Sequence, residues 1–357
     1  MKYKGALIGC GAISRKHIDA FEYIEDSCEL TAVCDLDTEK AGAAAARYSE
    51  LTECPSPKIY SDYKEMLETE KPDIAAIATS SSLHYPMTKD ALQAGCHVIL
   101  EKPIALAAEE MDSLIDLADE KQRKTAVCYI SRYAPHILKL REAVEKGRFG
   151  RILNGSIQVN WNRNNEYYKQ ASWRGTWDKD GGALMNQCTH GIDLLQWMMN
   201  DKAVKIHGLI RRYLRPIESE DFGAALIEFE NGGIGSVQGS VDVYPKNHDE
   251  TLSLFGEKGT VVFGGVAVNE VISWKFEDGN GGEEDEIISM AQNYRGHALL
   301  YKDFIQALRH DREPLIPLKE GRKSVDIVLG IYKSMKEEKS VELPVSFSTL
   351  DMKNVTL

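Results

Sequence analysis

One short segment near the N-terminus constrains the fold more than any other. An apolar run at residues 5–8 leads into Gly9-Cys10-Gly11-Ala12-Ile13-Ser14, and a helix is predicted over about 15–25. The order is strand, glycine turn, helix, with the pattern G-x-G-x-x-S. The first glycine allows the tight turn, the second lets the backbone approach a pyrophosphate at the helix N-terminus, and Ser14 is small enough for close packing. The segment therefore predicts a dinucleotide site.

The end of the second predicted strand bears on which dinucleotide is bound. Residues 29–34 form this strand, and Asp35 follows it directly. An acidic side chain there binds the ribose 2′-hydroxyl of NAD and repels the 2′-phosphate of NADP. Lys40 is the only nearby cation. The alternative is that Asp35 merely caps the next helix. We expect NAD rather than NADP.

Short apolar strands then alternate with helices through the first third of the chain. Further strands are predicted at 74–78, 97–100 and 125–128, and helices at 62–68, 86–94 and 111–121. This alternation is typical of a doubly wound parallel sheet. Ligands bind such sheets at the carboxyl ends of the strands, where the polar turn 79–84 and the step Glu101-Lys102-Pro103 fall. We expect an NAD-binding domain over 1–125.

The Glu-Lys-Pro step places a lysine at a strand end. Pro103 has no backbone N–H and breaks the strand, so Lys102 is expected to project where the nicotinamide should lie. A lysine there can hydrogen-bond a reacting hydroxyl and lower its pKa. The alternative is an ordinary surface lysine. The strand-end position favours a functional role.

A second polar pattern lies within an apolar stretch at 180–197. After Gly181-Gly182, the residues Asn186, His190, Asp193 and Trp197 are spaced by four, three and four, so one helix would carry them in a single stripe. These polar groups are costly to bury unless a polar partner meets them. A substrate with several hydroxyls would be such a partner, and His190 could move a proton. The alternative is an N-capped helix with a solvated edge.

The rest of the chain predicts a second, α+β domain over 126–357. Strands are expected at 152–161, 204–213, 222–229, 234–243, 252–255, 260–263 and 271–276, and helices at 296–310 and 318–338 that could pack back on the first domain. The strands could form one open, mainly antiparallel sheet. Such a sheet exposes one face unless something covers it, so we expect a homo-oligomer, a dimer or tetramer.

A long polar and aromatic segment, 162–179, follows the first of these strands. Loops of this length are usually functional or disordered. Arg163 and Arg174 can bind a phosphate or carboxylate in bidentate fashion, and the neighbouring aromatic rings can stack on a uracil or a sugar. The alternative is a loop packed on a partner subunit, and one loop can do both.

Composition excludes several other classes of protein. The net charge is −12 with no long basic run, which argues against a broad nucleic-acid surface. The seven cysteines form no C-x-x-C pair, which favours a reducing cytoplasm. No apolar run reaches the length of a membrane span, and no signal peptide is evident. No metal is expected, because His190 and Asp193 lack a third ligand and no His/Cys/Asp set is clustered in the sequence.

These motifs together resemble those of the Gfo/Idh/MocA oxidoreductase family. The matching segments are Ile8-Gly9-Cys10-Gly11, Asp35, Tyr60-Ser61-Asp62-Tyr63, Leu83-His84, the run from Ala94 to Pro103, the run from Gly181 to His190, and Asp193. The resemblance implies a Rossmann domain followed by an open-sheet domain. It also implies nicotinamide-dependent oxidation of a sugar or cyclitol hydroxyl, with Lys102 and His190 as the catalytic pair. Many members carry Asp where this chain has Asn186, so a role for this position as a base is in doubt.

A closer resemblance is to the branch that oxidises UDP-N-acetylglucosaminuronate at C3 with NAD. It rests on Trp161-Asn162-Arg163, Tyr167-Tyr168, the run from Trp173 to Trp177, the run from Gly182 to Gln187, and two glycine-rich runs, 256–261 and 264–269. Two other functions stay open: a dehydrogenase for inositol or a free sugar, and a non-catalytic NAD-binding regulator.

The motifs and the resemblance give two sets of candidate residues. Those expected at the cofactor are Gly9, Gly11, Ala12, Ile13, Asp35, Thr79, Ser80, His84, Glu101, Lys102, Trp161 and Arg163. Those expected at the substrate are Lys102, Arg163, Tyr167, Arg174, Thr176, Asn186, His190 and Asp193.

Overall fold

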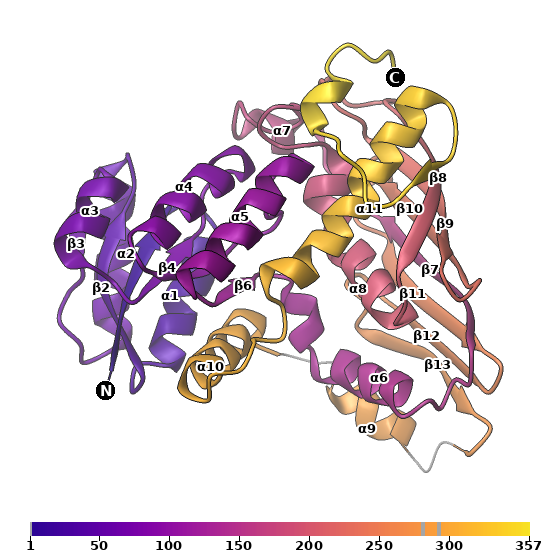
Figure 1. The fold of residues 1–357 in the computed structure, drawn as a ribbon, viewed down its shortest axis with the longest axis horizontal. Coiled ribbons are helices and arrows are strands. Elements are labelled where there is room, and N and C mark those ends of the chain that lie inside the picture. The colour runs from indigo at the N-terminus through magenta and orange to yellow at the C-terminus, as the bar shows by residue number, and fades with distance from the viewer. Residues whose placement is uncertain (1, 280–282, 291–293) are drawn as a thin grey trace. The chain divides into compact units, whose positions relative to one another are not determined.

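The structure is a computed structural model that describes residues 2–279, 283–290 and 294–357 (Figure 1). Its contacts divide the chain into two compact units. The first unit comprises Met1–Ala105, Glu109–Ile130 and Arg295–Arg322, and the second comprises Leu106–Ala108, Ser131–Tyr294 and Lys323–Leu357. The chain thus passes between the units several times rather than at one boundary.

The first unit is built on a six-stranded parallel sheet. Its strands are β1 (Tyr3–Ile8), β2 (Cys28–Cys34), β3 (Lys58–Tyr60), β4 (Ile74–Ile77), β5 (His97–Leu100) and β6 (Thr125–Val127), in the order β3-β2-β1-β4-β5-β6. Every neighbouring pair is parallel. β4 is buried at every residue, as a strand covered on both faces must be. The predicted doubly wound parallel sheet is confirmed.

Six helices belong wholly or mainly to this unit. They are α1 (Ser14–Tyr23), α2 (Thr38–Leu51), α3 (Tyr63–Glu70), α4 (Ser81–Gln93), α5 (Ala108–Lys121) and α10 (Gly296–Arg309). α1 packs against both α2 and α10, although α10 lies nearly 300 residues later in the chain. The prediction for α4 was wrong at its start, because the helix begins at Ser81 and contains Pro86. A proline within a helix removes its own backbone hydrogen bond but need not mark the first turn.

The second unit is built on an eight-stranded sheet. Its strands are β7 (Ile152–Asn160), β8 (Ala203–Arg211), β9 (Phe222–Phe229), β10 (Ile234–Ser240), β11 (Asp249–Gly256), β12 (Gly259–Gly264), β13 (Glu270–Phe276) and β14 (Val341–Glu342). The order is β13-β12-β11-β7-β10-β9-β8-β14. Only β7 and β10 pair in parallel among these described strands, and the other neighbours are antiparallel. The predicted mainly antiparallel sheet is confirmed.

The second unit also holds several described helices. They include η1 (Ile130–Tyr133), α6 (Pro135–Glu145), α7 (Asn165–Lys169), η2 (Leu184–Cys188), α8 (Thr189–Met199), α9 (Glu283–Met290) and η3 (Thr349–Met352), while α11 (Leu318–Glu337) runs from the first unit into the second. Of these, α8, η2 and α9 pack against strands of the sheet, and α8 lies on β7, β10 and β11. Gly239 in β10 permits close packing of η2, because a Cβ there would come within 2.6 Å of Cys188 Sγ and Leu184 Cδ2.

Two predictions for this unit need correction. The segment 162–179 is not wholly irregular, because α7 forms within it with Asn164 as N-cap. The predicted helical stripe from Asn186 to Trp197 is also interrupted. Residues 184–188 form a π-helical turn, and the α-helix begins only at Thr189. A π-turn holds more residues than an α-turn, so the spacing of four between Asn186 and His190 does not keep the α-helical register.

Across the described part of the chain, no helix combines the length and apolar character that crossing a membrane requires.

Candidate functional site

The glycine turn after β1 has the geometry of a dinucleotide cradle. Gly9 has a φ of +97°, and a Cβ there would lie 2.6 Å from the carbonyl oxygen of Ala78, at the end of β4. Only glycine fits this position, where the strand order reverses between β1 and β4. Gly11 faces open space, since a Cβ there would meet nothing within 4 Å. Ser14 Oγ donates to Gly11 O over 2.7 Å and closes the turn.

Asp35 lies directly beside this turn. Its Oδ2 accepts the backbone N–H of Cys10 over 2.7 Å, and its Oδ1 accepts that of Asp37 over 2.9 Å. These bonds fix the carboxylate at the end of β2, next to exposed Ala12 and Ile13. A glycine turn open to solvent, a following helix N-terminus and an oriented carboxylate fit the pyrophosphate and ribose of NAD.

The loops after β4 and β5 are tied together by His84. Its Nε2 lies 3.2 Å from Thr79 O and its Nδ1 lies 2.6 Å from Pro103 O. The ring is buried, and this burial lowers the pKa of His84. His84 therefore joins the loops that follow β4 and β5, and Lys102, in the second of these loops, is half-buried.

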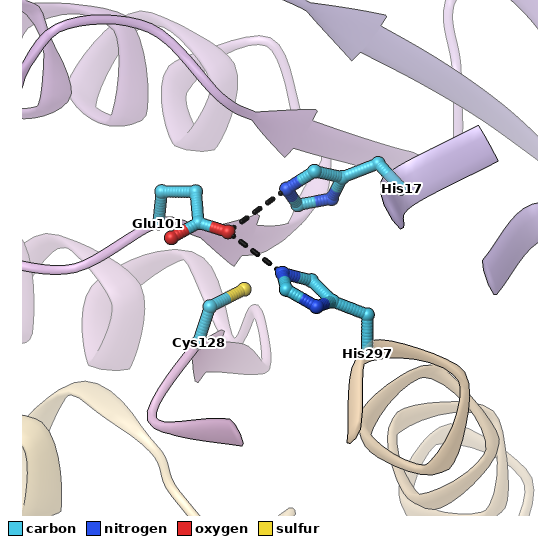
Figure 2. A group of neighbouring side chains, drawn as sticks. All are labelled: His17, Glu101, Cys128 and His297. Carbon is cyan, nitrogen blue, oxygen red and sulfur yellow. Dashed lines mark hydrogen bonds and ion pairs between the residues drawn. The ribbon is translucent and has the colours of Figure 1, made fainter. Parts of the chain in front are cut away.

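Glu101 belongs to a group of side chains that the sequence analysis missed. His17, Glu101, Cys128 and His297 are all buried, and their ligand-type atoms lie within 4.8 Å of one another (Figure 2). No sequence signal joins these positions, because they come from α1, the end of β5, the end of β6 and α10. The sequence shows no clustered His/Cys/Asp set, and this group forms only in the fold.

In the second unit, exposure singles out three polar residues. From Gly181 to Met199 every side chain is buried except those of Asn186, Gln187 and His190, which are partly exposed. Two amides and one imidazole are therefore partly exposed in an otherwise buried segment. Gln187 was not among the predicted site residues, although it lies next to Asn186 in the π-turn.

A chain of hydrogen bonds fixes these amides. Asn186 Nδ2 donates to Asp180 Oδ1, and the other oxygen of Asp180 accepts the backbone N–H of Gly175 over 2.6 Å. Gln187 Nε2 donates to Asn186 Oδ1 over 3.2 Å and to Tyr167 Oη over 2.8 Å. A carboxylate is thus present next to position 186, but it belongs to Asp180, six residues earlier, and it accepts a hydrogen bond from the Asn186 amide.

The two arginines of segment 162–179 are stacked on aromatic rings. The Arg163 guanidinium lies 4.9 Å from the Trp161 ring and 5.3 Å from that of Tyr167, and its Nε donates to Gln187 Oε1 over 2.7 Å. The Arg174 guanidinium lies 4.0 Å from the Tyr167 ring. Stacking of this kind holds a guanidinium plane in one orientation. The structure thus brings Trp161, Arg163, Tyr167 and Arg174 together with Gln187.

The two remaining predicted residues make internal contacts. Thr176 Oγ1 donates to Trp173 O over 2.8 Å. Asp193 is fully buried, and both its oxygens accept from Arg132, each over 2.7 Å. A bidentate pair of this kind leaves the carboxylate pointing into the protein. Arg132 was not predicted, because nothing in the sequence links it to a residue 61 positions later.

A buried carboxylate supports the turn that precedes these residues. Glu220 Oε1 accepts from the Leu184 backbone N–H over 2.8 Å and from Tyr332 Oη over 2.7 Å. Burial raises the pKa of Glu220 to about 8. Its carboxyl group packs directly on Gly182, whose φ of +101° and lack of a side chain allow the contact. Glu220 therefore holds the start of the π-turn.

Fold and site together define an α/β dinucleotide-binding unit joined to an open-sheet α+β unit. Residues 3–129 match the family model described as the oxidoreductase family with an NAD-binding Rossmann fold, and residues 137–262 match the GFO/IDH/MocA C-terminal domain. The chain belongs to the Gfo/Idh/MocA oxidoreductase family. The predicted family, oxidoreductase class and NAD cofactor are confirmed.

Two solved structures resemble the whole chain. The WlbA dehydrogenase from Bordetella pertussis, in complex with NADH and UDP-GlcNAcA, is 35% identical with a TM-score of 0.88, over 97% of this chain and 100% of that one. The WlbA dehydrogenase from Chromobacterium violaceum, in the same complex, is 34% identical with a TM-score of 0.89, over 97% of both chains.

Curated relatives match over shorter stretches. D-glucoside 3-dehydrogenase from Escherichia coli is 30% identical over 203 residues, which is 56% of this chain and 55% of the relative. A glycosyl hydrolase family 109 protein from Shewanella is 30% identical over 202 residues, 54% of this chain and 43% of the relative. The chain therefore spans about half the length of these relatives.

Proposed function

We propose that the protein oxidises a secondary hydroxyl of a sugar nucleotide with NAD, specifically C3 of a UDP-N-acetyl-hexuronate. The observation that carries this proposal is the trio Asn186, Gln187 and His190, which are partly exposed in a buried segment, with Gln187 accepting a hydrogen bond from stacked Arg163. Hydroxyl-binding amides, a titratable imidazole and oriented guanidinium groups suit a sugar that carries negative charge. Likeness over 97% of the chain to dehydrogenases solved with NADH and UDP-GlcNAcA supports the same substrate class.

The chemistry divides between a few side chains. NAD bound at the glycine turn would supply the hydride acceptor. His190 takes the proton of the substrate hydroxyl, and the electron pair of the O–H bond forms the carbonyl. As this happens the C3–H bond breaks, and the hydrogen leaves C3 as hydride with the electron pair of that bond. Lys102 donates a hydrogen bond to the reacting oxygen and stabilises the negative charge that develops there. Asn186, held by Asp180, binds a neighbouring hydroxyl rather than acting as a base.

The charged parts of the substrate are assigned to segment 162–179. Arg163 and Arg174 bind the diphosphate or the carboxylate, and Tyr167, already in contact with Arg174, offers a ring face. Thr176 lines a cavity of about 330 Å³ with Arg174 and Tyr168. We assign Asp193 to fixing α8 through Arg132 rather than to substrate contact.

Two measurements test the function. NADH formation at 340 nm is followed with NAD and a panel of UDP-N-acetylglucosaminuronate, UDP-N-acetylglucosamine, inositol and free hexoses. The proposal expects the uronate to be oxidised best, whereas no reduction of NAD by any sugar would favour a non-catalytic regulator. In parallel, UDP alone should raise the thermal midpoint, because a ligand that binds the native state stabilises it.

A dehydrogenase of free sugars is the second candidate. The match to D-glucoside 3-dehydrogenase favours it. In that case UDP would leave the thermal midpoint unchanged, and a hexose or glucoside would be the best substrate.

We also propose that the open face of the second-unit sheet pairs with a second copy of the chain. Leu209, Leu226 and Ile234 share this face and are 51%, 58% and 42% exposed. Exposed leucines and isoleucines on adjacent strands are typical of an interface. Light scattering after gel filtration should show a dimer or tetramer, and Leu226→Lys should shift it towards monomer. A monomeric wild type would contradict the proposal.

A further inference from the structure

The buried group around Glu101 is organised on one oxygen atom. Oε1 of Glu101 lies 3.1 Å from His17 Nε2 and 2.9 Å from His297 Nε2 (Figure 2). Glu101 is 8% exposed, His17 0%, His297 6% and Cys128 1%. A carboxylate out of water needs donors to its lone pairs, and here two imidazoles supply them.

The hydrogen bonds fix the protonation of the group. Since a carboxylate only accepts, each imidazole carries a proton on Nε2. His17 Nδ1 then accepts from Tyr301 Oη over 2.7 Å, so this ring is neutral and both its nitrogens are used. Burial would raise the pKa of Glu101, but the bonds from His17 and His297 outweigh burial and hold the pKa well below its usual range. Burial lowers the pKa of His17, consistent with a neutral ring.

The titratable groups next to Glu101 come from three parts of the first unit. α1 contributes His17, α10 contributes His297 and Tyr301, and Cys128 follows β6. Burial and the nearby carboxylate raise the pKa of the Cys128 thiol, so it stays protonated. Within this group Glu101 therefore carries a negative charge.

The same carboxylate reaches the catalytic loop. Its second oxygen, Oε2, accepts the backbone N–H of Lys102 over 3.3 Å. His17 lies in α1, one turn after the glycine turn, and His297 lies in α10 from near the end of the chain. One side chain thus links the helix of the glycine turn, a distant helix and the backbone that carries Lys102.

A metal ion is the other use for such donors, because His, Cys and Glu all ligate zinc. The geometry favours hydrogen bonds instead. Both Nε2 atoms approach the same carboxylate oxygen at ordinary hydrogen-bond distances, so each of them already has a partner within the group.

We propose that His17 and His297 are positioning residues that hold Glu101 and thereby set the backbone of Lys102 at the end of β5. This inference rests on the proposed role of Lys102 in catalysis. It predicts that removing one imidazole N–H displaces Lys102 without removing any group that touches the substrate. Displacements of about 1 Å at such sites lower rates by about 100-fold.

The test uses His297, because Gln places an N–H near the position of Nε2 and Leu does not. In His297→Leu, kcat with NAD and UDP-N-acetylglucosaminuronate should fall about 10- to 100-fold, with KM and the NADH dissociation constant changed less than about threefold. His297→Gln should restore most of kcat. The matched control is His97→Leu, at the opposite end of β5, where Nδ1 accepts from the Lys124 N–H over 2.9 Å. It should lower the thermal midpoint and leave kcat within about twofold.

Labelling of Lys102 by an amine-reactive reagent, read by peptide mass spectrometry, gives a readout that needs no turnover. Its rate should change at least about threefold in His297→Leu and stay unchanged in His97→Leu. Equal effects of the two leucine variants on labelling and kcat would overturn the inference, as would about one bound zinc per chain. Failure of the proposed function is a separate outcome: the wild type itself would then form no NADH with UDP-N-acetylglucosaminuronate, whatever the labelling shows.

Discussion

Two buried glutamates, one in each unit, differ in charge: Glu101 is ionised and Glu220 is protonated near neutral pH. Glu101 is 8% exposed and Glu220 is 0% exposed, so both have left water almost completely. Glu101 accepts from two imidazole N–H groups and one backbone N–H, and its pKa is held well below the usual range. Glu220 accepts from one backbone N–H and one phenol, and burial raises its pKa to about 8.

The difference teaches that donors, rather than depth, decide the charge of a buried carboxyl group. In the first unit the anionic Glu101 directly precedes Lys102, which is proposed to act as a cation. In the second unit the neutral Glu220 packs closely on the backbone of Gly182. In each unit a buried carboxyl group thus contacts the backbone beside a proposed site residue, but in a different charge state.

The largest expected effect concerns the residue that Glu101 precedes. Lys102→Met should lower kcat by about 1,000-fold or more, because it removes the group that stabilises the developing negative charge. NADH binding, measured by fluorescence, should change little. Lys124→Met is the control, since Lys124 directly precedes β6, at the amino end of that strand, and pairs with Asp311 and Glu313. Equal losses in both variants would contradict the assignment.

The contact of Glu220 with Gly182 predicts the next largest effect. Gly182→Ala should destabilise the protein by about 2–5 kcal/mol, since it combines a left-handed φ with an overlap on the Glu220 oxygens. Gly232→Ala separates these causes, because Gly232 has a φ of +86° and nothing within 4 Å of an added Cβ. It should cost only about 1–2 kcal/mol in urea unfolding. If Gly232→Ala cost as much as Gly182→Ala, the overlap of the new Cβ at residue 182 with the Glu220 oxygens would add nothing to the loss of stability.

Replacing each glutamate by glutamine tests the comparison directly. Glu101→Gln should cost about 2–3 kcal/mol at pH 7, because charged hydrogen bonds are lost and an amide N–H₂ must face donors. Glu220→Gln should not destabilise the protein at that pH, since it replaces a neutral group by a neutral group and the native state no longer has to take up a proton on folding. Urea unfolding of both variants measures the difference. Similar costs would mean that the two carboxyl groups carry the same charge.

The smallest effect is a pH dependence. The folded-state pKa of Glu220, about 8, exceeds its ordinary value of 4.5, so the native state holds a proton that the unfolded state releases. Stability from this group is therefore present at low pH and is lost as pH rises towards 8, by about 2 kcal/mol between pH 6 and 8. Glu220→Gln should flatten the unfolding free energy over this window. An unchanged slope would place the titration elsewhere.

The first unit could be predicted from the sequence because its signals are local. The glycine turn, Asp35 and the Glu-Lys-Pro step each lie within a few residues of a strand end, and β5 has the bounds that were predicted. The positions of His17, Glu101 and His297 relative to one another could not be predicted, because the contacts join residues 84 and 196 positions apart. Only the packing of α1 and α10 on the sheet brings them together.

In the second unit the prediction failed where the backbone departs from a regular helix. Asn186 and His190 were assigned by α-helical spacing, but a π-turn carries Asn186. Asp193 is taken up by Arg132, and the carboxylate that acts on Asn186 comes from Asp180. Such pairings depend on tertiary contacts that no period in the sequence encodes. The assignment of site residues to substrate and cofactor stays a prediction.

The transfer of deuterium from C3 tests the central proposal most directly. UDP-N-acetylglucosaminuronate labelled with deuterium at C3 is incubated with the protein and NAD, and the reduced cofactor is analysed by mass spectrometry. The account predicts that the NADH carries the label and that Lys102→Met forms almost none. Unlabelled NADH, or no NADH while a free sugar is oxidised, would contradict it.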